Sequence, residues 1–214
     1  MEREIIVLTK SSKHNNYCIA GVDTTTGEWI RPISTNVALE GAVLSNDIIY
    51  KNGSSVQVLD KVKVSFISHS PTLAQPENYI YDSSKYWIKT GSVTLDELIG
   101  IRGYDQPDII FYNYDKDVSE KVIGGQPSLL FVEVRNSRIF IKTFENSRRI
   151  QFNFSYNGVG YSFFKISDEA VQKSFSDFPD GSYNHRDTLP VVFSLTDKYT
   201  VTNKYYKMAA QLFY

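Results

Sequence analysis

The chain has 214 residues, of which 42% are apolar, so its composition excludes a disordered protein and suffices for one large β domain or two small ones. Its net charge is −1, which excludes the molecule-wide positive field that attracts duplex nucleic acid and leaves only a local site for such a ligand. A single cysteine, Cys18, excludes an internal disulfide, and no apolar run has the roughly 18 residues of a membrane span, so we expect a cytoplasmic protein without a membrane partner.

Residues 1–124 are predicted to form a small β barrel with one short helix. Aromatic residues make up 14% of the chain and favour strands over helices. Apolar alternation predicts strands at 4–8, 17–23, 29–34 and 60–70, with a polar loop at 8–16 and a hairpin turn at 24–27. A helix is predicted near 94–100, because Thr94 can cap it, Glu97 follows at capping-box spacing and Gly100 can end it.

Residues 125–214 are predicted to form a second barrel after a linker at 123–128, where Gly-Gly and Pro interrupt two dissimilar stretches. Residues 1–124 carry 12 Lys and Arg against 16 Asp and Glu, and residues 125–214 carry 11 against 8, so the second part is the basic one. A helix is predicted near 168–178 with Asp168 as its N-cap. Strands are predicted at 129–135, 138–144, 148–156, 160–167, 189–196 and 205–214.

This pattern predicts an all-β fold with minor helix, in which two small OB-like Greek-key barrels are packed together. The boundary is expected between residues 100 and 128, and we take 1–124 and 125–214 as the two domains. One larger barrel would give the same number of strands, so the pattern leaves that alternative open.

Catalytic and metal-binding motifs are missing from the sequence. The three histidines, His14, His69 and His185, are far apart and none stands at metal-ligand spacing from Cys18 or a carboxylate. No nucleophile elbow, phosphate loop, dinucleotide fingerprint or zinc-protease motif occurs. We therefore predict no catalytic residues, no metal and no cofactor, although an acid–base site built from distant residues would leave no local motif.

One predicted strand of the second barrel has a face suited to single-stranded nucleic acid. Arg138, Phe140, Lys142 and Phe144 alternate with Ile139, Ile141 and Thr143, so cations and rings share one side of the strand. Cations can contact phosphates while rings stack on bases, and Arg148 and Arg149 follow in the next segment. The alternative is that Phe140 and Phe144 pack under the helix near 168–178 while the cations are solvated.

The first barrel offers a different candidate site for a small anionic ligand. Lys10, Lys13 and His14 stand in the predicted loop 8–16, where they could bind an anion or form an ordinary hairpin loop. Trp29 and Arg31 share one face of a strand, either as a binding surface or as a structural clamp that holds the first barrel to its neighbour. Trp87 either joins this pocket or caps the barrel.

Five segments resemble the prokaryotic dual-OB domain family, in the same order over most of the chain. The resemblance is most specific in Cys-Ile-Ala-Gly to Trp-Ile-Arg-Pro and in Gln-Pro-Glu-Asn, and it is weakest from about 103 to 130. It implies two OB-like barrels and a nucleic-acid or nucleotide-binding role in bacterial conflict and defence. The segments are "KSSKHNNYCIAGVDTTTGEWIRPIS", "VQVLDKVKV", "QPENYIYD", "YWIKTGSVTLDELIG" and "LPVVFSLTDKYTVTNKYYKMAAQLFY".

The leading hypothesis is a non-catalytic module that binds single-stranded RNA or DNA through the second barrel. The alternative is an enzyme or sensor acting on a small nucleotide-derived ligand in the first barrel, which the nearly neutral chain suits because a small anion needs few donors. A third hypothesis is a module that binds protein subunits of a defence complex.

Overall fold

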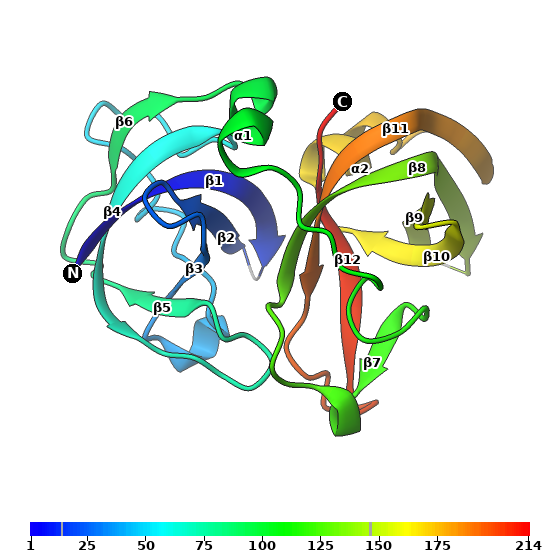
Figure 1. Cartoon of the computed structure of the whole chain (residues 1–214), viewed down its shortest axis with the longest axis horizontal. Coiled ribbons are helices and arrows are strands. Elements are labelled where there is room, and N and C mark those ends of the chain that lie inside the picture. The colour runs from blue at the N-terminus through cyan, green and yellow to red at the C-terminus, as the bar shows by residue number, and fades with distance from the viewer. Residues whose placement is uncertain (14, 146) are drawn as a thin grey trace. The chain divides into compact units, whose positions relative to one another are not determined.

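The computed structural model describes residues 1–13, 15–145 and 147–214, and the chain divides into two compact units, Met1–Gly103 and Tyr104–Tyr214 (Figure 1). Each unit is built mainly of strands, with short helices between or after them. Among the described residues, no helix combines the length and apolar character needed to cross a bilayer.

The described residues of the first unit form six strands and one α-helix. Thr94 caps α1 through its side chain, which accepts from the Glu97 N–H, and the Glu97 carboxylate accepts from the Thr94 N–H, so the predicted capping box is confirmed. A 3-10 turn, η1 (Val37–Leu39), follows the third strand. The elements are β1 (Glu2–Lys13), β2 (Asn16–Asp23), β3 (Trp29–Ile33), β4 (Asp60–His69), β5 (Asn78–Tyr81), β6 (Ile88–Ser92) and α1 (Leu95–Arg102).

The strands of the first unit close into a barrel in the order β1-β2-β3-β5-β4, because β4 also pairs with β1. The β3–β5 pair is parallel, and β6 adds to the outer edge of β4. Gly21 lies opposite Val7 in the β1–β2 pair, where a Cβ atom would clash with the Ile6 carbonyl oxygen, so this close approach requires glycine. Side chains such as Ile5, Ile30 and Val64 fill the barrel.

The second unit contains the remaining strands, with one α-helix between its third and fourth barrel strands. Asp168 is the N-cap of this helix, as predicted, and its carboxylate accepts from the N–H groups of Ala170 and Val171. The elements are β7 (Asp117–Ser119), η2 (Glu120–Val122), β8 (Leu129–Phe144), β9 (Ser147–Tyr156), β10 (Val159–Ile166), α2 (Glu169–Ser174), β11 (Gly181–Leu195) and β12 (Lys204–Leu212).

The second unit closes by the same connectivity as the first. The circuit is β8-β9-β10-β12-β11 and back to β8, and the β10–β12 pair is parallel, as β3–β5 is in the first unit. Its core is aromatic: the rings of Phe154 and Tyr161 stack at 5.0 Å, and Phe154 lies 4.7 Å from Phe193. Two separate closed circuits confirm the two OB-like barrels and rule out one larger barrel.

Residues 104–124 belong to the second unit, whereas the sequence placed them with the first. The Phe131 N–H donates to the Asp105 carboxylate at 2.7 Å, and the Asp105 N–H donates to the Phe131 carbonyl at 2.7 Å. The predicted linker glycine Gly124 is bonded through both its N–H and its carbonyl to the Tyr112 hydroxyl, at 3.1 and 3.3 Å.

Three local predictions differ from the structure. Residues 8–13 continue strand β1 where a loop was expected, because they pair with β2 from Lys10↔Ile19 to Lys13↔Asn16. The strands predicted at 129–135 and 138–144 are one strand, β8, whose pairing with β9 shifts between Arg135 and Arg138. Helix α2 ends at Ser174, before the predicted residue 178.

Candidate nucleic-acid interface

Trp29 and Arg31 lie on the outer side of β3, but both are covered. Ile30 between them belongs to the barrel core, so the alternation was predicted correctly. Trp29 is 8% exposed and its ring lies 5.1 Å from the Arg102 guanidinium, while Arg31 is 9% exposed and ion-paired to Glu77 at 3.1 Å. These contacts are those of a clamp within the first barrel.

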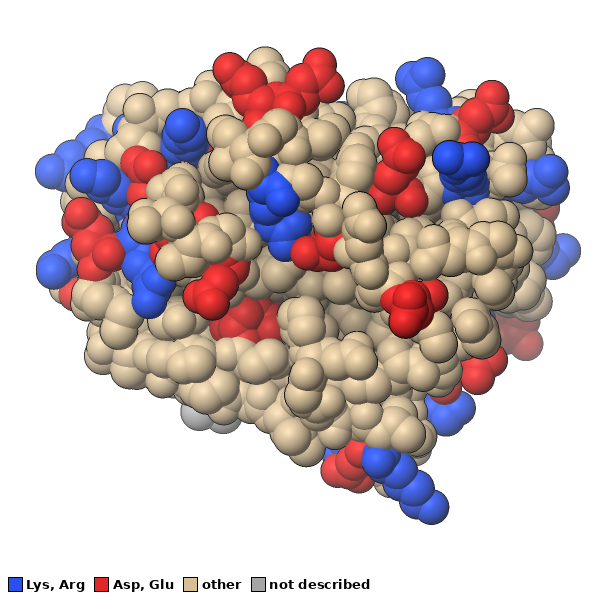
Figure 2. All heavy atoms as spheres, in the orientation of Figure 1, with Lys and Arg blue, Asp and Glu red and all other residues tan. Residues whose placement is uncertain are grey.

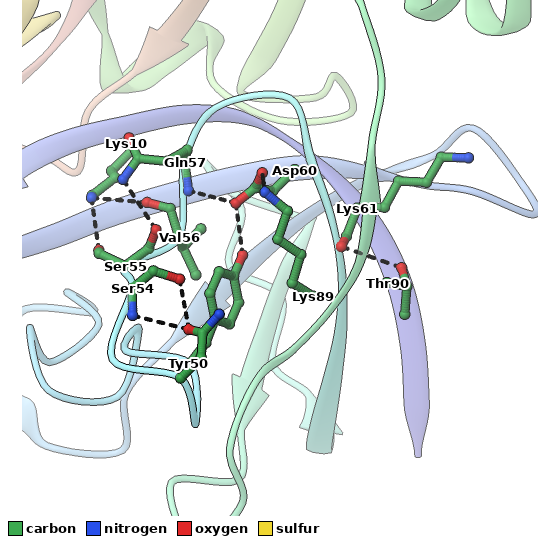
Figure 3. Close-up of polar contacts among 11 residues, drawn as sticks. Lys10, Tyr50, Ser54, Ser55, Val56, Gln57, Asp60, Lys61, Lys89 and Thr90 are labelled. Carbon is green, nitrogen blue, oxygen red and sulfur yellow. Dashed lines mark hydrogen bonds and ion pairs between the residues drawn. The ribbon is translucent and has the colours of Figure 1, made fainter.

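The other predicted ligand residues of the first barrel also make internal contacts. The Lys10 ammonium donates to the Ser55 hydroxyl at 3.0 Å and to the Val56 carbonyl at 2.9 Å (Figure 3). Lys13 donates to the Glu40 carbonyl at 2.7 Å. His14 lies outside the described residues.

Trp87 is a core residue, 1% exposed, and its ring meets Tyr81 edge-on at 6.0 Å. It lies in the same core cluster as Ile30, whereas Arg31 points to the other side of β3. Trp87 and Arg31 therefore lie on opposite sides of the barrel wall and do not form the shared pocket that the sequence left open.

Asp60 organises a second polar cluster in the first barrel (Figure 3). Its buried carboxylate accepts from the Tyr50 hydroxyl at 2.9 Å and the Gln57 N–H at 2.9 Å, and it pairs with the Lys89 ammonium at 2.5 Å. Burial, with the hydrogen bond to Asp60, raises the pKa of Tyr50 far above its ordinary value. These groups hold the loop before β4 in place.

The outer face of the second barrel is different, because its polar and aromatic side chains are open to solvent. Arg138, Phe140 and Lys142 point outward from β8, while Ile139 and Ile141 between them are fully buried. Arg138, Lys142 and Phe144 are exposed and Phe140 is half-buried. Phe144 is 50% exposed and therefore does not pack under α2, whereas the half-buried ring of Phe140 meets the ring of Phe163 on β10.

Strand register extends this face across β9. Residues directly opposite each other in antiparallel strands point to the same side of a sheet. Asn153 lies opposite Arg138, Gln151 opposite Phe140, and Arg149 opposite Lys142. The Arg149 guanidinium also lies 5.2 Å from the centre of the Phe144 ring.

Strand β10 completes the face with Phe163 and Lys165. Lys165 lies opposite Gln151, and Phe163, two residues earlier, sits in a bulge with a φ of 65° and is 43% exposed. The Phe163 N–H donates to the Asn153 side chain at 2.7 Å, and the Gln151 side chain donates to the Phe163 carbonyl at 3.0 Å. The Phe163 ring meets Phe140 edge-on at 5.3 Å. We call this surface the β8–β10 interface: Arg138, Phe140, Lys142, Phe144, Arg149, Gln151, Asn153, Phe163 and Lys165.

Two of the predicted cations are engaged near the interface edge. Lys142 lies 3.5 Å from the Asp180 carboxylate, which also accepts from the Thr143 N–H; this hydrogen bond is the main reason that the pKa of Asp180 is lowered. The Arg148 guanidinium donates to the carbonyl oxygens of Phe175 and Phe178. Arg148 therefore holds the segment after α2 and does not belong to the interface.

Sequence reasoning missed the contribution of β9 and β10, namely Gln151, Asn153, Phe163 and Lys165. Strand pairing between distant segments cannot be seen in a local pattern. One signal was available for Phe163: it is followed by Phe164, and consecutive residues of a strand point to opposite sides, so one of the two rings has to face solvent.

The positive charge of the second half does not extend to the whole second unit. With the division at Gly103, this unit carries 13 Lys and Arg and 13 Asp and Glu. Figure 2 shows basic and acidic side chains interspersed over the face in view. Positive charge is therefore a local property of the β8–β10 interface, where Arg138, Lys142, Arg149 and Lys165 gather.

Comparison with protein families agrees with the two barrels. The family model described as "Dual OB-containing domain" matches residues 3–212. A solved structure of a murine DNA-binding protein with double-stranded DNA is similar over 100% of this chain and 96% of its own, at 9% identity and a TM-score of 0.35, values too low to support any inference. No curated protein matches the chain.

Proposed function

Because the chain belongs to the dual OB-containing domain family, we propose that its second barrel is a non-catalytic module that binds single-stranded nucleic acid on the β8–β10 interface. OB barrels bind oligonucleotides on the face of their second and third strands, which are β9 and β10 in this barrel. The observation that carries the proposal is the exposed ring of Phe163 beside Phe140, with cations on the same face. Rings stack on bases while cations contact phosphates.

Single strands suit this interface better than a duplex does. Stacking on Phe163 needs a base whose face is free, which a paired and stacked duplex does not offer. The equal numbers of basic and acidic residues in the second unit provide no long-range attraction for duplex phosphates. The amide groups of Gln151 and Asn153 are bonded to the Phe163 backbone, which fixes the backbone that carries the ring before any ligand binds.

We propose a bacterial conflict or defence system as the setting, following the family resemblance in the sequence. The nucleic acid would be the first partner, and protein subunits of the same system a second class of partner. The genes beside the one that encodes this chain test the setting: nuclease or other effector genes there would support it, and housekeeping neighbours would count against it.

Fluorescence anisotropy with labelled oligonucleotides tests the function. We expect single-stranded RNA or DNA to bind more tightly than a duplex of the same sequence. The logarithm of the affinity should fall linearly with the logarithm of the salt concentration, at roughly −0.7 for each phosphate contacted. Absence of binding to any single strand at low salt would overturn the proposal.

A matched pair of charge variants localises the site. Lys165→Gln removes a cation of the interface and should flatten the salt dependence by roughly one phosphate contact. Lys63→Gln removes an exposed cation from β4 in the first barrel and should leave the salt dependence unchanged. Equal effects of the two variants would place the binding surface elsewhere.

The alternative of a small nucleotide ligand is tested in the same series. A mononucleotide that raises the melting temperature, together with oligonucleotides that have no effect, would favour the alternative over the proposed function. The contacts made by Lys10, Lys13, Trp29 and Arg31 within the first barrel give this alternative no specific support.

A further inference from the structure

A polar hollow of about 550 Å³ opens beside the β8–β10 interface, where β8 and β11 are both irregular. The pairing of β8 with β9 shifts between Arg135 and Arg138, and the pairing of β11 with β8 shifts between Asn184 and Arg186. Two bulges at one level of neighbouring strands turn their side chains out of the regular alternation. The side chains around the hollow include Asn136, Arg138, Asn184, Arg186, Asp187 and Thr188.

The hollow has a fixed backbone. The Ser137 hydroxyl donates to the Arg186 carbonyl at 2.8 Å and accepts from the Arg186 N–H at 2.9 Å, so one buried side chain joins the two bulges. Asn136 holds a φ of 51°, in the left-handed region that asparagine tolerates. The backbone that carries the donors of the hollow is therefore held in place without a ligand, which lowers the cost of binding one.

The chemistry of the hollow favours an anion. Arg138 and Arg186 contribute two guanidinium groups, two carboxamides and a hydroxyl add neutral donors, and Asp187 is the carboxylate that opposes them. His185 adds no charge, because burial lowers the pKa of its imidazole, and its ring packs between Phe175 at 6.1 Å and Tyr214 at 5.3 Å. Arg138, Arg186 and Asp187 together give the hollow a net charge of +1.

The hollow is continuous with the β8–β10 interface. Asn184, Arg138 and Asn153 lie opposite one another on β11, β8 and β9 and form one row on the outer face. Arg138 belongs to both surfaces, as part of the interface and as a wall of the hollow. A strand lying on the interface can therefore place its end in the hollow.

We propose that this hollow binds a phosphate monoester at the end of the nucleic-acid strand that occupies the interface. This inference rests on the proposed function and adds a preference for phosphorylated ends. A terminal monoester carries nearly two negative charges at neutral pH, whereas a diester within the strand carries one, so two guanidinium groups favour the monoester. A terminal group can also enter a hollow that a strand continuing in both directions cannot.

Labelled oligonucleotides of one sequence test the inference, with a 5′-phosphate, a 3′-phosphate or only hydroxyl ends. We expect one of the two phosphorylated forms to bind roughly tenfold more tightly than the hydroxyl form, as for a group that gains charge-assisted hydrogen bonds. Equal affinities of all three forms would overturn the inference and leave the proposed function intact. Absence of binding by every form would overturn both.

Variants of opposite charge in the hollow sharpen the test. Arg186→Gln should abolish the preference for the phosphorylated end while retaining the affinity of the hydroxyl form, and Asp187→Asn should increase the preference. Lys173→Gln removes an exposed cation of α2 that belongs to neither surface, and it should change neither the preference nor the affinity. A preference that survives Arg186→Gln in a protein of normal melting temperature would show that the hollow is not its source.

A free nucleotide also carries a phosphate monoester that could bind in the hollow. A nucleoside monophosphate is therefore added as a competitor of the labelled strand. We expect weak competition, because the mononucleotide lacks the contacts that the strand makes along β8–β10. Competition as strong as that of the unlabelled phosphorylated strand would overturn the assignment of the hollow to a strand end.

Discussion

Arg31 and Glu77 form a buried pair that joins β3 to the segment before β5, two stretches of chain 46 residues apart. The Arg31 guanidinium donates to one Glu77 carboxylate oxygen through Nε at 3.3 Å and through Nη2 at 3.1 Å, and the Arg31 N–H donates to the Glu77 carbonyl at 2.8 Å. The side chains retain only 11% and 4% of their exposure. Arg31 thus links β3 to the segment before β5 through both its backbone and its side chain.

Arg31→Ala should lower the free energy of unfolding of the first barrel by about 3–5 kcal/mol, because it leaves the Glu77 carboxylate buried without its cation. Arg31→Lys should also destabilise, since lysine lacks the planar fork that reaches the carboxylate with two N–H groups. Chemical denaturation measures both effects. Oligonucleotide binding by the folded fraction should stay the same.

The control is the paired change Arg31→Met with Glu77→Leu, which removes both charges and should recover most of the lost stability. If Arg31→Ala melts like the parent, the pair does not act as a clamp and the outer face of β3 becomes a candidate binding surface again.

Phe163→Ala should weaken single-strand binding roughly 5- to 150-fold, the range that corresponds to about 1–3 kcal/mol for one base stacked on a ring. The melting temperature should change little, because the ring is already 43% exposed. Tyr86→Ala, which removes a ring that is 61% exposed in the first barrel, is the matched control and should bind like the parent. Equal binding by both variants would remove Phe163 from the site.

Lys207 should make the free energy of unfolding of the second barrel depend on pH. Lys207 is 1% exposed, and its ammonium donates to the Ile110 carbonyl and to both oxygens of Asn113, at 2.5–2.8 Å. Burial lowers its pKa to about 7, although Asp115 and Asp117 act in the opposite direction. Between pH 7 and about 10 the unfolded chain therefore holds a proton that the folded chain has released.

In that range the free energy of unfolding should rise with pH by up to about 1.4 kcal/mol per unit. Well below pH 7 both states are protonated, so Lys207 should add nothing to the slope, and the destabilisation by its buried charge is then at its largest. Urea denaturation at several pH values measures the slope. Lys207→Met removes the titrating group, so its slope should be smaller by this amount. Parallel curves for the two proteins would contradict the lowered pKa.

Gly21→Ala should destabilise the first barrel by about 1–3 kcal/mol, because the added methyl group would clash with the Ile6 carbonyl and push β1 from β2. Gly91→Ala is the control: it lies on β6, where an added Cβ meets no atom within 4 Å, and should be tolerated. Thermal melts of the two variants should therefore differ, and identical melts would show that the two strands can separate at little cost.

We propose the end of the first domain at Gly103, and fragments test this position. Residues 1–103 and 104–214, produced separately, should each unfold cooperatively. Residues 125–214 alone should not, because they lack Asp105, strand β7 and the acceptors of Lys207. A stable fragment 125–214 would instead support the boundary that the glycines suggest.

The sequence predicts best those features whose parts are close together in the chain. The capping box of Thr94 and Glu97 and the N-cap Asp168 each depend on three or four consecutive positions, and both are present in the structure. The outward direction of Trp29, Arg31 and the β8 residues follows equally from alternation.

Features that join distant segments could not be predicted. Glu77 covers Arg31 from 46 residues away, so the exposed cation that alternation suggests is buried. The sequence alone assigns residues 104–124 to the first barrel. In the structure Asp105 is hydrogen-bonded to β8 and strand β7 pairs with β12, and both of these partners lie far along the chain. The hollow arises from two bulges on different strands, and a bulge leaves no reliable mark in a local pattern.

The pairing that closes each barrel has a consequence for the speed of folding. Glu2 pairs with Ser65 in the first barrel, and Leu129 pairs with Ser194 in the second, so neither ring can close until more than sixty residues have been looped together. Proteins dominated by such distant contacts fold in milliseconds to seconds, whereas helical bundles need microseconds to milliseconds. Until then the two apolar runs that pair with each other in the finished barrel, Leu129–Val132 and Val191–Phe193, should both lack their partner strand, and we expect a slowly folding chain to aggregate through them.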